Sequence, residues 1–141
     1  MKVNLTRTND AFQFKATGAS GEAAILDAAS EIGGSDQGIR PMEMILMGLA
    51  GCSAFDIVHI LKKQRQDLKD LDIEVDGKRR SEVPKIFTDI HMKFIIRGNV
   101  DPAKAERAVR LSVEKYCSVH EMLKSVVSIT WSMQIESEAS L

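Results

Sequence analysis

The sequence predicts an α+β fold, and the order of its elements is the main reason. Short stretches in which apolar and polar residues alternate indicate strands in the first third of the 141 residues, in the middle and near the end. A long apolar stretch indicates a helix, and two shorter helices precede the last strand. This order differs from the regular alternation of strand and helix that produces a parallel sheet.

The composition is that of an ordinary globular domain. Hydrophobic residues make up 44% and charged residues 28%, and 19 basic residues against 20 acidic ones leave a net charge of −1. A balanced charge disfavours nucleic acid and an acidic membrane surface as partners. No apolar run follows Met1-Lys2, and the uncharged stretch 44–55 is shorter than the roughly 18 residues that span a bilayer. We therefore expect a single domain, residues 1–141, in the cytoplasm.

The first third of the chain is expected to form three short strands. Alternating apolar residues flank the turn residues Asn9-Asp10, and glycines precede a third, weaker apolar segment. The strands are expected at residues 3–5, 12–14 and 23–26, and a glycine-rich loop at 33–38.

The next element is predicted to be a helix of about six turns. Pro41 occupies the favoured first position, and nothing interrupts the pattern from Met42 to about Gln64. Both faces of this helix are apolar, which predicts burial on most sides. Small residues at its centre, 48–54, are expected to allow close packing.

The second half predicts a hairpin, two helices and a strand. Asp101-Pro102 is a strong helix start, and Ser118 with Glu121 matches the capping box of another helix. That second helix is expected to turn Met122 and Val126 inward. The antiparallel strands are expected around 71–75 and 86–96, the helices at 102–116 and from 118, and the last strand at 129–135.

Two cysteines, Cys52 and Cys117, are the residues that could carry chemistry. Cys52 lies among small residues in the long helix, where it is either a packed core thiol or a thiol with a pocket beside it. Cys117 directly precedes a helix start, where the helix dipole favours thiolate. It could equally be a structural residue that packs at the junction between two helices. Their separation of 65 positions fits neither a secreted disulfide scaffold nor a CxxC pair.

Charged residues and histidines near the cysteines suggest further possibilities. Arg40 could lower the pKa of a thiol and Glu43 could hold that arginine, although helix-entry electrostatics explains Glu43 as well. Cys52 and Cys117 with His59 and His120 lack the close spacing of a zinc site, so we expect no metal. No nucleotide-binding motif is present, and we expect no cofactor.

Three stretches, 40–56, 82–88 and 114–119, resemble the OsmC/Ohr family of thiol-dependent hydroperoxide reductases, and within it the small OsmC-like branch. The resemblance covers nearly the whole chain. It implies an OsmC-like fold in which antiparallel sheets wrap around a long central helix, in an intertwined homodimer with two active sites at the interface.

The resemblance also implies a chemistry. Cys52 would attack a hydroperoxide in oxidative or osmotic stress defence, Cys117 would resolve the product as a disulfide, and a dithiol would reduce it. Glu43 and Arg40 are the candidates for the family's activating pair, although Met42 stands where the family has its Glu and the family's Arg comes from the N-terminal strands. The alternative is a non-enzymatic redox-sensitive or ligand-binding dimer on the same scaffold.

Overall fold

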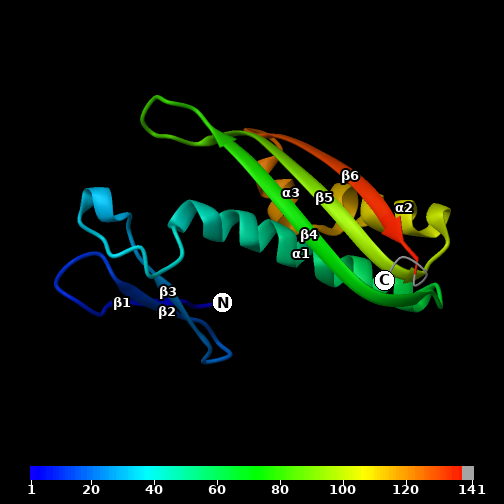
Figure 1. The fold of residues 1–141 in the computed structure, drawn as a ribbon, viewed down its shortest axis with the longest axis horizontal. Helices are drawn as coiled ribbons and strands as arrows, with labels where there is room; N and C mark the ends of the chain where they lie inside the picture. The colour runs from blue at the N-terminus through cyan, green and yellow to red at the C-terminus, as the bar shows by residue number, and fades with distance from the viewer. Residues whose placement is uncertain (138–141) are drawn as a thin grey trace. The chain divides into compact units, whose positions relative to one another are not determined.

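The computed structural model of the protein describes residues 1–137 (Figure 1). The chain forms two compact units, Met1–Ile45 and Leu46–Leu141. The long helix α1 (Pro41–Lys63) begins in the first unit and continues through the second. The six-turn helix predicted from the sequence is thereby confirmed within one residue at each end.

The first unit is built on a three-stranded antiparallel meander. Its strands β1 (Asn4–Arg7), β2 (Phe14–Thr17) and β3 (Ala23–Leu26) pair in sequence order. The three predicted strands are present, but Phe12 lies in the turn before β2 rather than in the strand. A 3₁₀ turn, η1 (Ser30–Ile32), and the predicted loop lead from β3 to α1.

The second unit is built on a mixed three-stranded sheet. Strands β4 (Asp67–Arg79) and β5 (Phe87–Asn99) form the predicted antiparallel hairpin, and β6 (Ser128–Glu136) joins the other side of β5. The pairing of β5 with β6 is parallel, so the expectation of purely antiparallel sheets is wrong. The helices between β5 and β6 form a crossover that returns the chain to the starting end of β5.

The core of this unit lies between the inner face of the sheet and the helices. The strands alternate with period two, and the helices supply apolar stripes of period 3.6. Trp131 of β6 packs edge to face against Phe94 of β5, with 6.5 Å between the ring centroids. In Figure 1 the sheet lies in front of α2 and α3. The buried residues of the core include Leu49, Ile57, Leu61, Ile90, Met92, Phe94, Ile96, Ala105, Ala108 and Val109.

Among residues 1–137 only one side of α1 is buried by the chain itself, whereas burial on most sides was expected. Phe55 is 80% exposed and Met47 52% exposed. The reason is that one sheet covers one helix face, and the described part of the second unit leaves the opposite face uncovered. By length and composition alone α1 could cross a membrane, because its most apolar stretch of 18 residues has a mean hydropathy of 1.9.

The helical segment after β5 changes its winding before it reaches Cys117. The α-helix α2 (Pro102–Leu111) is capped by Asp101, whose Oδ1 accepts a hydrogen bond of 3.0 Å from the backbone N–H of Lys104. It continues as a π-helical turn, η2 (Ser112–Tyr116), rather than as the uninterrupted α-helix that was predicted. The wider turn changes the phase of the chain directly before Cys117.

The short helix α3 (Ser118–Leu123) is capped differently from the prediction. The sulfur of Cys117 accepts a hydrogen bond of 3.4 Å from the backbone N–H of His120, so the cap is Cys117 and Ser118 is the first helical residue. Met122 and Val126 are exposed, and Val127 is buried in place of Val126. A helix of six residues has too few turns to bury every apolar side chain.

Candidate functional site

Cys117 lies at the corner between η2 and α3, where local backbone contacts hold it firmly. Its N–H donates a hydrogen bond of 2.8 Å to the carbonyl oxygen of Ser112, which closes the π turn. Its carbonyl oxygen accepts a bond of 3.1 Å from the N–H of Glu121 in α3. The side chain is only 2% exposed. The sulfur therefore occupies a defined position inside the protein.

A buried hydrogen bond joins this corner to the centre of α1. The hydroxyl of Ser112 donates to the carbonyl oxygen of Ser53 at 2.9 Å, and both serines are fully buried. Because Ser53 directly follows Cys52, this bond places η2 against the part of α1 that carries the first cysteine. The thiols of Cys52 and Cys117 lie close enough to interact electrostatically. The structure therefore brings the two predicted cysteines together.

The surroundings of Cys117 favour its protonated form. Burial raises the pKa of the Cys117 thiol above its ordinary value, and the neighbouring Cys52 thiol adds to that effect. The N–H of His120 and the hydroxyl of Ser53 act in the opposite direction. The Ser53 hydroxyl is buried without a hydrogen bond of normal geometry among residues 1–137. Burial is the largest effect, so Cys117 is a thiol at neutral pH.

Cys52 differs from Cys117 in its exposure. It is a free cysteine of intermediate exposure in the middle of α1, whereas Cys117 is buried. A solute can therefore approach the first sulfur more readily than the second. This difference in access, together with the raised pKa of Cys117, makes the two thiols chemically unequal.

His120 is part of the same corner. Its Nδ1 is buried and lacks a hydrogen-bond partner among the described residues. Burial lowers the pKa of His120, and the nearby Lys124 lowers it further, while Glu121 and Glu114 oppose these effects. The imidazole is therefore neutral at physiological pH.

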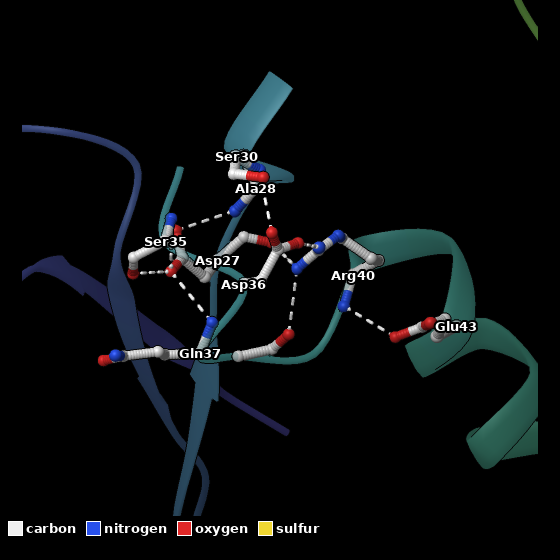
Figure 2. Close-up of polar contacts among 9 residues, drawn as sticks. Asp27, Ala28, Ser30, Ser35, Asp36, Gln37, Arg40 and Glu43 are labelled. Atoms are coloured by element: carbon white, nitrogen blue, oxygen red, sulfur yellow. Dashed lines mark hydrogen bonds and ion pairs between the residues drawn. The ribbon is translucent and has the colours of Figure 1, made fainter. Parts of the chain in front are cut away.

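Arg40 and Glu43 lie in the first unit, and Figure 2 shows their contacts. The guanidinium of Arg40 donates bonds of 3.1 Å to the carbonyl oxygens of Asp27 and Gly38, and pairs with the carboxylate of Asp36. Glu43 Oε2 accepts a bond of 2.9 Å from the backbone N–H of Arg40, which is one half of a capping box. These contacts agree with the alternative, helix-entry interpretation of Glu43. An activating role for Arg40 and Glu43 stays a prediction.

Asp27 organises the loop that holds Arg40, a role that the sequence analysis missed. It is 3% exposed, and its carboxylate accepts hydrogen bonds from the backbone of Ala28, Ser35 and Gln37 and from the Ser35 hydroxyl (Figure 2). The hydroxyl of Ser35 makes the largest contribution to lowering the pKa of Asp27. An aspartate among small polar loop residues could have indicated such a network.

The histidines do not complete a metal site with the cysteines. Within residues 1–137, no group of three or more His, Cys, Asp or Glu side chains is arranged to hold a metal ion. His59 lies on the exposed surface of α1, and no hydrogen bond of its side chain is seen in the described part of the chain. The residues that sequence reasoning missed at the cysteine site are Ser53 and Ser112. The sequence signals that could have found them are the position of Ser53 directly after Cys52 and the helical spacing of Ser112 from the apolar residues Ala105, Ala108 and Val109.

Comparison with known proteins places this geometry in a family. The model of the OsmC-like protein family matches residues 34–132. Protein YhfA of Escherichia coli strain K12 is 44% identical over 123 residues, which cover 86% of this chain and 89% of YhfA.

Solved structures share the fold. A hypothetical protein from Aquifex aeolicus VF5 is 36% identical and superposes with a TM-score of 0.80 over 96% of each chain. An organic hydroperoxide resistance protein OsmC from Legionella pneumophila superposes with a TM-score of 0.70 over 95% of this chain and 97% of its own, and at 18% identity it shows the fold alone. The expected α+β OsmC-like fold is thus confirmed, and the chain belongs to the OsmC-like protein family.

Proposed function

We propose that the protein reduces organic hydroperoxides, with Cys52 as the attacking thiol and Cys117 as the resolving thiol. The observation that carries the proposal is the interaction of the two thiols across the contact between α1 and η2. The family includes hydroperoxide reductases, and the Legionella relative is described as an organic hydroperoxide resistance protein.

The environments of the two cysteines support this division of roles. Cys52 is the more exposed thiol, so a peroxide reaches it first. Cys117 is buried and protonated at neutral pH, which suits a thiol that reacts only after its neighbour has been oxidised. The hydrogen bond from Ser112 to Ser53 keeps the two within reach, because it ties the elements that carry them.

The proposed reaction has three balanced steps. The Cys52 thiolate attacks one oxygen of the hydroperoxide, the O–O bond breaks, and the other oxygen leaves as an alcohol after taking up a proton. The Cys117 sulfur then displaces water from the Cys52 sulfenic acid and forms a disulfide. A dithiol reduces this disulfide to two thiols and is itself oxidised to a disulfide.

The functional protein is proposed to be a homodimer. Each unit leaves large apolar side chains in contact with solvent, notably Leu5 in the first unit and Met47 and Phe55 in the second. Exposed apolar surface of this extent is typical of an interface, and a second copy of the chain is the occupant that the family resemblance implies. Sedimentation that shows a stable folded monomer at micromolar concentration would contradict the dimer.

Arg40 and Glu43 remain the proposed activating residues for Cys52. Both have structural contacts of their own in the first unit, so a competing function is a redox-sensitive or ligand-binding dimer without catalysis. The free thiols fit a reducing compartment, and we place the protein in the cytoplasm.

Peroxide consumption with a dithiol reductant tests the proposal. Wild-type protein should consume cumene hydroperoxide in the presence of dithiothreitol, and Cys52→Ser should abolish this activity. In Cys117→Ser, oxidised Cys52 should accumulate as sulfenic and then sulfinic acid, because the resolving thiol is missing.

Peptide mapping after one equivalent of peroxide tests the disulfide step, and the rate of peroxide consumption separates the two functions. A linked pair of peptides containing Cys52 and Cys117 would support the two-cysteine reaction. Slow peroxide consumption that is the same in wild type and Cys52→Ser would favour the non-catalytic dimer.

A further inference from the structure

A second feature of the second unit is a pocket of about 400 Å³ between the C-terminal half of α1 and the segment α2–η2. Ile60 of α1 and Leu111 of α2 supply apolar walls, and Tyr116 adds an aromatic ring. Lys63 and Arg107 reach the same pocket from the two opposing helices. Its size and mixture of apolar and polar groups match those of small-molecule sites.

The two cations at this pocket have no anionic partner within residues 1–137. The side chains of Lys63 and Arg107 make neither an ion pair nor a hydrogen bond among the described residues. Arg110, one turn further along α2, is by contrast paired with Glu106 and lies 5.8 Å from the centroid of Trp131. Intramolecular partners thus engage Arg110, which lies outside the pocket. Lys63 and Arg107, which line the pocket, remain available to an anion.

We propose that this pocket binds a small organic anion with an apolar body, such as a medium-chain carboxylate. The apolar chain would contact Ile60 and Leu111, and the carboxylate would lie between the ammonium of Lys63 and the guanidinium of Arg107. The carboxylate of Asp56 also lines the pocket and opposes an anion. The lysine, arginine and aspartate side chains at the pocket thus carry one positive charge in excess.

The pocket lies beside the cysteine site without being part of it. At 100° per residue, positions 52, 56, 59 and 63 of α1 fall within about 60° of one another, so Cys52 shares a helix stripe with the pocket. Lys63 is about 16 Å further along the helix axis than Cys52, so a bound carboxylate is held away from the thiols. The inference goes beyond the proposed peroxide reduction, and each stands if the other fails.

Calorimetric titration of the full-length protein with octanoate tests the inference. Saturable binding is expected, weaker at higher salt because the side chains of Lys63 and Arg107 are exposed. Lys63→Gln and Arg107→Gln should each weaken it about threefold to fivefold, the effect of one exposed ion pair, and Lys63→Arg should retain it. The matched control is Lys62→Gln, whose side chain lines a different pocket against β4 and should leave binding unchanged.

Two further measurements test whether charge at the pocket changes the affinity in the expected direction. Asp56→Asn should tighten octanoate binding, because it removes the opposing charge from the wall. Octanamide, which has the same chain without the charge, should bind more weakly than octanoate to the wild-type protein. Absence of octanoate binding, equal binding of the two compounds, or equal effects of Lys62→Gln and Lys63→Gln would overturn the proposal.

Discussion

The hydrogen bond from the Ser112 hydroxyl to the Ser53 carbonyl offers a test of how α1 is tied to the corner at Cys117. Replacing Ser112 by alanine removes one buried donor at 2.9 Å and little volume. The Ser53 carbonyl also accepts the regular bond of α1, so it is not left without a partner. The change therefore isolates the loss of a single tertiary hydrogen bond.

The expected cost follows from that isolation. A buried intramolecular hydrogen bond contributes about 1 kcal/mol net, and alanine recovers a few tenths of a kcal/mol in helix propensity. Ser112→Ala should lower the free energy of unfolding by about 0.5–1 kcal/mol. For a domain of this size, that corresponds to a decrease in Tm of roughly 2–4 °C.

Thermal unfolding followed by circular dichroism, at one fixed protein concentration, measures this shift. Ser118→Ala is the matched control: the serine is exposed, and Cys117 rather than Ser118 caps α3. The control should change Tm by less than about 2 °C. A larger loss in Ser118→Ala than in Ser112→Ala would refute both the cap assignment and the importance of the tie to α1.

Three further changes test the roles assigned to Glu43, Cys117 and Asp27. Glu43→Ala should cost about 0.5–1 kcal/mol through loss of the cap at the start of α1, whereas Glu43→Gln keeps the acceptor and the stability; a loss of peroxide reduction in Glu43→Gln at unchanged Tm would instead indicate a catalytic carboxylate. Because the folded-state pKa of Cys117 is raised, the unfolded chain ionises first, and stability should fall as pH rises above the ordinary value of 9.0; denaturant titrations across this range should show a flatter pH profile for Cys117→Ala, and identical profiles would contradict the assignment. The pKa of Asp27 is lowered from its ordinary value of 3.8, so its contribution is present above that pH and lost as the pH falls below it; hydrogen exchange of residues 27–37 should show this loss in the wild type and not in Asp27→Asn.

Much of the local structure was determined by the sequence alone. The proline at position 41, the Asp101-Pro102 start and the alternating residues of β6 each specify their element through interactions with near neighbours. The hairpin of β4 and β5 is equally local. The resemblance of residues 40–56, 82–88 and 114–119 to a known family indicated the fold and pointed to Cys52 and Cys117, because short motifs of fixed spacing can be recognised from the sequence alone.

The tertiary structure decided the features that depend on residues far apart in the chain. Periodicity could not show that β6 runs parallel to β5, that the chain enters a π turn at Ser112, or that Cys117 replaces Ser118 as the cap. Nor could it show the bond between Ser112 and Ser53, which lie 59 residues apart. The burial that raises the pKa of Cys117 arises from the packing of η2 on α1. Local patterns record how a residue interacts with its near neighbours, whereas these contacts depend on which distant segments the folded chain brings together.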